Sequence, residues 1–328
     1  MKKVIGCFRT AALFVGSVVG AGFATGQEVA LFFGGDGILG ILVASLFMAL
    51  CAFCFSEIGY RRALGEKTAF LTDVLVSLSS FAVYAAMIAA AEEVLFSLSG
   101  LRGLSSLLAI GILFFAGRKM GATSLLNLVA VPFMIVVIVL VGGRSGGKIV
   151  GGFHPLYALS YGGMNLLFSG ALMVKAGEES SRFERIGAAL LSGAAIFLML
   201  FFMRRCLTGV LGDMPFLIVA DRENLGRAAR VAVLLAIVTT MASCAYLCVR
   251  FVSSVTGDPL LSAPVVALVG ILVASFGFAR IVRLTYPVVS FLGLIATVLA
   301  ITISALSLFR KRGRFAAKFS NRKSFPDT

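Results

Sequence analysis

Long apolar runs separated by short polar segments fill the chain from end to end. A helix needs roughly 20 apolar residues to cross the hydrocarbon core of a bilayer, so each long run predicts one membrane-spanning helix. A shorter apolar run at 215–220 is too short to span and predicts a hairpin that dips back toward the transport path. The ten expected spans are residues 11–33, 37–60, 69–98, 104–116, 123–141, 156–174, 186–203, 228–252, 260–276 and 282–309.

Lys and Arg residues accumulate in alternate loops, as expected where the cytoplasmic loops are the basic ones. The side that holds both termini collects 19 of the 29 basic residues, seven of them after residue 309. Both termini are therefore predicted to be cytoplasmic, with the protein in the plasma membrane.

Composition supports a membrane protein and argues against other classes. Charged residues make up 13% of the chain, against roughly 25% in soluble domains, so too few are present to cover a water-facing surface. The net charge of +14 lies in short loops between apolar runs and in the tail, so no nucleic-acid partner is predicted. The six cysteines lie in or beside apolar runs and are read as small buried side chains.

The spans predict one transmembrane domain at 1–309, with halves of about 1–141 and 155–309, followed by a basic cytoplasmic tail at 310–328. Five spans are an odd number, so a second set of five enters the membrane from the opposite face. The topology therefore permits an inverted repeat.

The first predicted span is unusually rich in glycine, because Gly16, Gly20, Gly22 and Gly26 all fall within it. Each glycine destabilises a helix relative to alanine. Two interpretations remain open. The pairs four residues apart favour close packing of neighbouring helices. Alternatively, the glycines mark an unwound stretch whose free N–H and C=O groups bind a solute and a cation.

The segment Gly20-Ala-Gly-Phe-Ala-Thr-Gly-Gln-Glu28, followed by Phe32-Phe33 and the turn Gly34-Gly35-Asp36-Gly37, resembles the YkvI-type bacterial membrane proteins. This segment and the second span, with Glu57 and Gly59-Tyr-Arg-Arg62, are more distantly similar to LeuT-fold symporters of the amino acid–polyamine–organocation superfamily. That likeness implies an all-α integral membrane fold of about ten transmembrane helices. It also implies a 5+5 inverted repeat with broken first and sixth helices.

The LeuT likeness implies a sodium site between the first-helix break and the eighth span. Main-chain carbonyls and two adjacent hydroxyls would form it. An alternative is that the two threonines of the eighth span bond back to their own helix or to a neighbour. Span 123–141 holds no lysine, which favours sodium over a lysine-linked proton route; no other cofactor is expected. The implied sodium ligands are Gly16, Val19, Ala236, Thr239 and Thr240.

The same likeness places the solute beside the break, where main-chain N–H groups would hold an anionic group. Residues 161–170 of the sixth span contain three glycines, which predicts a second break, with a continuous packed helix as the alternative. The candidate solute-binding residues are Ser17, Gly20, Gly22, Tyr84, Tyr161, Asn165 and Ser169.

Four carboxylates within spans are candidate functional groups, since a charge in hydrocarbon costs roughly 2.5–3.5 kcal/mol. Glu28, Glu92 and Glu93 are expected to form an outer gate or a proton-linked cluster, or else to lie in a solvated vestibule. The LeuT likeness implies that Glu57 braces the sixth-span break, and the alternative is that it simply pairs with Arg61 or Arg62.

The leading hypothesis is a secondary transporter that moves an amino acid or a similar zwitterion with sodium by alternating access. A ligand-sensing membrane protein with the same fold is the alternative. An enzyme is not predicted, because His154 is the only histidine and no catalytic constellation lies at membrane depth. A small-molecule substrate and the lipid bilayer are the expected partners, and the oligomeric state stays open.

Overall fold

The computed structural model describes residues 2–62, 66–115, 120–210, 212 and 214–320, and within them thirteen helices. The first predicted span is interrupted. It comprises α1 (Lys2–Val18), α2 (Ala21–Ala24) and α3 (Gln27–Phe33). Gly20 is extended, with φ −90° and ψ −168°, and Gly26 takes a left-handed φ of 88° that glycine adopts without strain. The predicted break in the first helix is therefore confirmed.

Each of the other predicted spans coincides with a helix, because the apolar runs correctly mark where helices form. The boundaries differ by a few residues, and charged residues extend several helices beyond the apolar runs. The remaining helices are α4 (Ile38–Arg61), α5 (Glu66–Ser99), α6 (Leu104–Phe115), α7 (Met120–Arg144), α8 (Pro155–Gly177), α9 (Arg182–Cys206), α10 (Pro215–Arg222), α11 (Gly226–Thr256), α12 (Pro259–Ala274) and α13 (Phe278–Ser320).

An all-α membrane protein is confirmed, while the count of ten crossings stays a prediction. Six segments of the described residues are long and apolar enough to cross a bilayer. Two more apolar segments, Leu104–Phe115 and Leu261–Ala274, are shorter. The six long segments are Ile38–Arg61, Thr72–Ser99, Met120–Arg144, Arg182–Cys206, Gly226–Thr256 and Phe278–Leu306.

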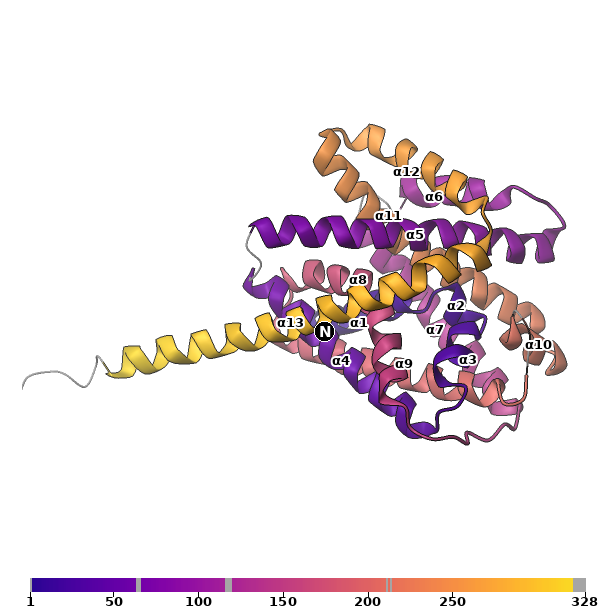
Figure 1. Cartoon of the computed structure of the whole chain (residues 1–328), viewed down its shortest axis with the longest axis horizontal. Helices are drawn as coiled ribbons and strands as arrows, with labels where there is room; N and C mark the ends of the chain where they lie inside the picture. The colour runs from indigo at the N-terminus through magenta and orange to yellow at the C-terminus, as the bar shows by residue number, and fades with distance from the viewer. Residues whose placement is uncertain (1, 63–65, 116–119, 211, 213, 321–328) are drawn as a thin grey trace, which may run out of the picture.

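The helices form one bundle, with the last helix extending beyond it (Figure 1). Within the bundle, α8 packs between α4 and α13, α1 packs against α7 and α9, and α11 packs against α5 and α7. Since α13 continues to Ser320, the predicted tail begins as helix. Arg118, Lys119 and residues 321–328, which contributed to the charge count, lie outside the described residues.

The predicted break in the sixth span is wrong, because α8 is one unbroken helix from Pro155 to Gly177. Its glycines instead allow neighbouring helices to approach. A Cβ on Gly163 would lie 2.8 Å from the Ser290 carbonyl, and one on Gly293 would lie 1.7 Å from the Gly163 carbonyl. The alternative interpretation, a continuous helix whose glycines allow close packing, therefore holds for α8.

The same close approach joins α8 to α4 at the other end of the helix. A Cβ on Gly59 would lie 1.8 Å from the Val174 carbonyl, and one on Gly177 would lie 2.1 Å from the Ser56 carbonyl. The backbones of three helices are therefore in direct contact through glycines, which fixes α8 as the central element.

The predicted re-entrant hairpin at 215–220 is instead the single short helix α10. It packs against α11 and α9. Its apolar side chains are largely buried, so the run packs on the bundle as one helix rather than as a hairpin.

We expect Gly293→Ala to lower the free energy of unfolding by about 1–3 kcal/mol, because the added methyl meets the α8 backbone. Gly111→Ala is the matched control: its Cβ would have nothing within 4 Å, and stability should change by less than about 1 kcal/mol. A thiol-reactive fluorophore measures unfolding through the six buried cysteines. Equal effects of the two substitutions would contradict glycine packing.

Candidate functional site

The interruption of the first helix leaves main-chain carbonyls without their helical partners. The N–H of Gly20 donates to Val18 O at 3.0 Å, so Gly16 O does not receive the bond that a continuous helix would give it. The Thr240 hydroxyl from α11 instead lies 3.2 Å from Gly16 O and 3.3 Å from Val19 O. Three of the five predicted sodium ligands are thus in mutual contact.

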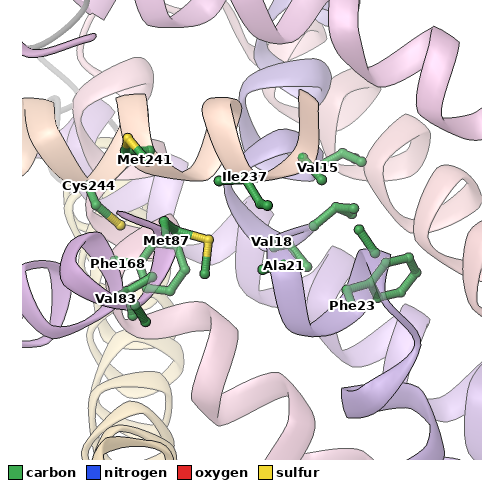
Figure 2. Close-up of a cluster of buried hydrophobic side chains, with 14 of the residues drawn as sticks. Val15, Val18, Ala21, Phe23, Val83, Met87, Phe168, Ile237, Met241 and Cys244 are labelled. Atoms are coloured by element: carbon green, nitrogen blue, oxygen red, sulfur yellow. The ribbon is translucent and has the colours of Figure 1, made fainter. Parts of the chain in front are cut away.

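The other two predicted sodium ligands lie beside Thr240 on α11. The Thr239 hydroxyl donates to Ala236 O at 3.0 Å, and all three residues are buried. Thr239 therefore follows the alternative of bonding to its own helix, whereas Thr240 bonds across to the break. Figure 2 shows Ile237 and Met241 of the same helix among apolar side chains next to the interrupted segment.

Asn127 is a polar residue at the break that the sequence interpretation missed. It lies on α7, and a Cβ on Gly16 would be 1.7 Å from its Oδ1. That oxygen is buried and without a hydrogen-bond partner, while Nδ2 donates to Thr123 O at 2.9 Å. An amide within an apolar span is itself a signal for a functional site, and it was available from the sequence.

A small cavity of about 20 Å³ lies against the break, with room for about one water molecule. Three candidate solute-binding residues line it: Ser17, Gly20 and Asn165. The Ser17 hydroxyl donates to Phe14 O at 2.7 Å, and Asn165 donates to Tyr161 O at 3.0 Å. Most of the remaining lining is apolar, contributed by Val18, Val83, Met87, Met164, Phe168 and Val289.

The other candidate solute-binding residues do not line this cavity. The Tyr84 hydroxyl donates to Ala109 O of α6 at 3.3 Å, and Ser169 donates to Asn165 O at 2.6 Å. Tyr161 is fully buried, with its ring edge-on to Phe33 at a centroid distance of 5.2 Å and its hydroxyl without a partner. Gly22 lies against the Glu28 carboxylate.

Glu28 is the acidic residue of the cavity. Its Oε1 accepts a hydrogen bond of 2.9 Å from the Tyr286 hydroxyl of α13, while Oε2 is buried without a partner. The carboxylate folds back onto the break: a Cβ on Gly22 would lie 2.2 Å from Oε1. Tyr286 was missed, since nothing in the sequence pairs residues 258 positions apart.

The expected cluster of Glu28, Glu92 and Glu93 does not form. Glu92 accepts hydrogen bonds of 2.7 Å from the Gly103 N–H and from the Ser105 hydroxyl, at the start of α6. Glu93 is exposed on α5. Among the described residues, no three His, Cys, Asp or Glu side chains gather closely enough to hold a metal ion. Glu92 therefore stabilises a helix start, where a negative charge is favourable.

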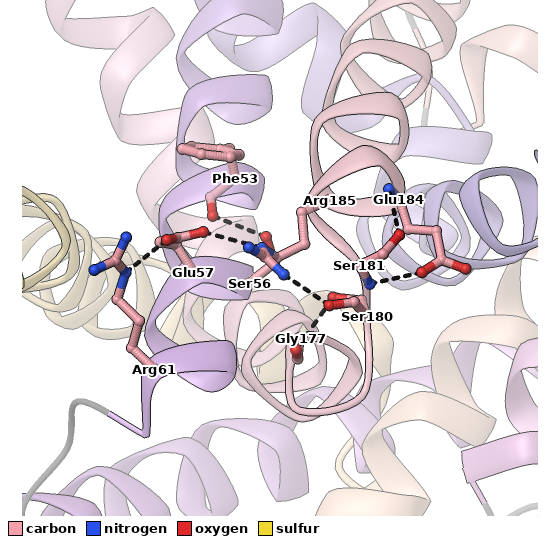
Figure 3. A network of polar contacts seen from close by, with 9 residues as sticks. All are labelled: Phe53, Ser56, Glu57, Arg61, Gly177, Ser180, Ser181, Glu184 and Arg185. Carbon is pink, nitrogen blue, oxygen red and sulfur yellow. Dashed lines mark hydrogen bonds and ion pairs between the residues drawn. The ribbon is translucent and has the colours of Figure 1, made fainter. Parts of the chain in front are cut away.

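Glu57 pairs with arginines rather than bracing a break, because α8 has no break. Its two oxygens bind Arg61 at 2.6 Å and Arg185 at 3.0 Å (Figure 3). Arg185, which was missed, also donates to Ser180 O at 2.7 Å and lies over the Tyr60 ring. This network joins α4 to the start of α9. Of the two partners predicted for Glu57, Arg61 and Arg62, only Arg61 is confirmed.

At the opposite end of the bundle, Arg204 holds the end of α3. Its guanidinium donates to Phe33 O at 2.7 Å and to Gly34 O at 2.8 Å, where a helix C-terminus favours positive charge. It also reaches Val150 O at 3.2 Å in the α7–α8 loop. The buried Asp36 in the following turn pairs with His154, so one set of contacts closes this end.

The short helix α10 covers the break from the same end. The Phe216 N–H donates to Thr25 O at 3.0 Å, at the α2–α3 junction. Asp221 and Arg230 join α10 to α11 through two hydrogen bonds, and these bonds lower the pKa of the Asp221 carboxyl. The α2–α3 junction is therefore linked through α10 to the start of α11 by hydrogen bonds.

Two larger pockets lie toward the Glu57 end. One, of about 250 Å³, has an apolar lining from α4, α5, α8 and α13. The other, of about 300 Å³, is lined by Arg62, Asp73, Lys175, Glu178 and Arg250, among others. These two pockets therefore lie on the side opposite Arg204 and α10.

No model of a known protein family matches this sequence, and no curated protein matches it by sequence. Solved structures do match over most of the chain. MhsT in complex with L-phenylalanine has a TM-score of 0.65 and 17% identity, covering 92% of this chain and 88% of its own. Mhp1, a nucleobase-cation-symport-1 family transporter with bromovinylhydantoin bound, has a TM-score of 0.60 and 16% identity, covering 93% and 79%.

A manganese transporter of Eremococcus coleocola has a TM-score of 0.53 and 15% identity, covering 94% of this chain and 77% of its own. At these identities the likeness shows the fold. The chain has the LeuT fold that these neighbours share, and the neighbours are membrane transporters rather than enzymes. The resemblance to YkvI-type proteins is not confirmed by sequence comparison and stays a prediction.

We expect Arg185→Met to lower the free energy of unfolding by about 3–5 kcal/mol, because it leaves Glu57 as a buried charge with one partner fewer. The double variant Glu57→Gln/Arg185→Met should lose less than the sum of the single variants. Arg182→Met, at an exposed position on the same helix, is the control. Additive losses, measured by thermal unfolding in detergent, would show that the pair is not coupled.

Proposed function

We propose that this protein is a sodium-coupled secondary transporter of an amino acid or a related zwitterion, working by alternating access around the break in the first helix. One observation carries the proposal. The Thr240 hydroxyl of α11 lies between the Gly16 and Val19 carbonyls that the break has released. The LeuT fold of the chain, shared with transporters, supports the same conclusion.

The oxygen atoms at this position suit a sodium ion. Sodium is a hard cation that prefers neutral oxygen ligands, and the residues supply the carbonyls of Gly16, Val19 and Ala236 with the hydroxyls of Thr239 and Thr240. Thr240 now donates its hydrogen to one of the released carbonyls. Binding of sodium would turn that hydrogen away, so the ion would join the break to α11.

The cavity beside the break suits a small solute with both charged and apolar parts. Main-chain N–H groups near Gly20 and Gly22 would hold a carboxylate, and Met87, Met164 and Phe168 would contact the apolar part. Methionine side chains adapt readily in shape, which supports opening a cavity that is now the size of one water molecule. MhsT, which has the same fold, binds L-phenylalanine.

The distribution of contacts supports alternating access. Arg204, His154 and α10 close one end of the bundle, while the larger pockets lie toward the other. With both termini cytoplasmic in the plasma membrane, the closed end would face outward. The 5+5 inverted repeat would then provide two bundles that rock against each other.

Uptake of labelled amino acids into proteoliposomes, with and without an inward sodium gradient, tests the proposal. Uptake should be concentrative only with the sodium gradient. Transport that proceeds equally well in potassium would contradict sodium coupling. Solute binding without flux would favour a sensing protein.

We expect Thr240→Ala to raise the sodium concentration that half-saturates uptake by roughly 10-fold or more, because it removes one ligand and leaves two buried carbonyls unpaired. Thermal stabilisation by sodium relative to potassium should fall in parallel. Thr302→Ala is the matched control, since the Thr302 hydroxyl is exposed and bonds to its own helix at Val298 O. An unchanged sodium dependence in Thr240→Ala would contradict this site.

A further inference from the structure

The carboxylate of Glu28 lies in the cavity without a fixed positive partner. The side chain is only 5% exposed and borders the cavity together with Tyr286. Tyr286 donates one hydrogen bond to Oε1, whereas Oε2 is buried with no partner. No Lys, Arg or His is among the residues that line the cavity.

A buried carboxylate of this kind is stabilised either by taking up a proton or by pairing with a positive charge from outside the chain. Removing an unpaired charge from water costs several kcal/mol, and one neutral hydrogen bond offsets only part of that cost. Among the described residues, no three acidic, cysteine or histidine side chains could together hold a metal ion, so Glu28 belongs to no such group. A cation that enters and leaves with the solute supplies such a positive charge.

The backbone is shaped to place this carboxylate at the break. Oε1 would be 2.2 Å from a Cβ on Gly22, so only glycine there lets the side chain fold onto α2. Gly22 belongs to the segment at which the solute is proposed to bind. The carboxylate group therefore lies beside the position that the proposed function gives to the solute.

We infer that Glu28 binds the ammonium group of the transported solute, so that the solutes of this protein carry a primary or secondary amine. This assignment rests on the proposed function and narrows it. An ammonium group donates charge-assisted hydrogen bonds, for which Oε2 is the free acceptor. Tyr286 orients the carboxylate through Oε1 and does not compete for that acceptor.

Binding to the full-length protein in lipid nanodiscs tests the inference through matched pairs of solutes. Each pair is an amino acid and its deamino analogue: L-alanine with propanoate, L-leucine with 4-methylpentanoate, and L-phenylalanine with 3-phenylpropanoate. We expect the wild-type protein to bind at least one amino acid at least 10-fold more tightly than its deamino partner, as measured by calorimetry.

The variant Glu28→Gln should lose roughly 10- to 100-fold in affinity for the amino acid and leave the deamino analogue unchanged. Glu28→Asp keeps the charge on a shorter side chain and should retain preference for the amine. Tyr286→Phe should cost several-fold at most. Glu179→Gln, at an exposed position, is the control for loss of a negative charge and should behave as wild type.

Several outcomes would overturn the inference. Deamino analogues that bind as tightly as amino acids would refute the ammonium site and leave the transporter proposal intact. An unchanged preference in Glu28→Gln, with altered pH dependence of uptake alone, would make Glu28 a proton carrier instead. If no member of any pair binds and none is transported, both proposals fail.

Discussion

The structure depends on one lost hydrogen bond, the bond that the Gly20 N–H would give to Gly16 O in a continuous helix. Within lipid such a vacancy is tolerated only where protein or a water-filled cavity surrounds it, because the hydrocarbon offers no partner for the free groups. Here the vacancy is enclosed by α5, α7, α8, α11 and α13. The Thr240 hydroxyl lies within hydrogen-bond distance of the released carbonyls. The need to enclose this break explains why so many helices pack around the interrupted first helix.

Glycine acts in two opposite ways in this bundle, and the neighbours decide which. In the first helix, Gly20 and Gly26 adopt non-helical backbone conformations, and the chain separates into three helices. In α8, Gly163 keeps helical geometry, since Gly293 of α13 packs against its carbonyl and leaves no room for a distortion. A helix held on both sides by close backbone contacts cannot unwind, however many glycines it contains.

This contrast explains what the sequence could and could not predict. Apolar runs identified the helices, glycine density marked the first break, and the likeness to LeuT-fold symporters implied that Thr240 meets the break. Nothing local distinguishes Gly20 from Gly163, because the difference lies in residues far along the chain. For the same reason Glu57 was assigned without Arg185, and Glu28 without Tyr286: their partners are 128 and 258 positions away.

The hydrogen bond between the Phe216 N–H and Thr25 O has a mechanical consequence. It ties the surface helix α10 to the joint between α2 and α3, while the Asp221–Arg230 pair ties α10 to the first turns of α11. The interrupted first helix and α11 are thus connected twice. Thr240 connects them deep in the bundle, and α10 connects them at its rim. The helix α10 is thus a cross-link between them, held near its start by the Thr25 carbonyl and in its last turn by Arg230.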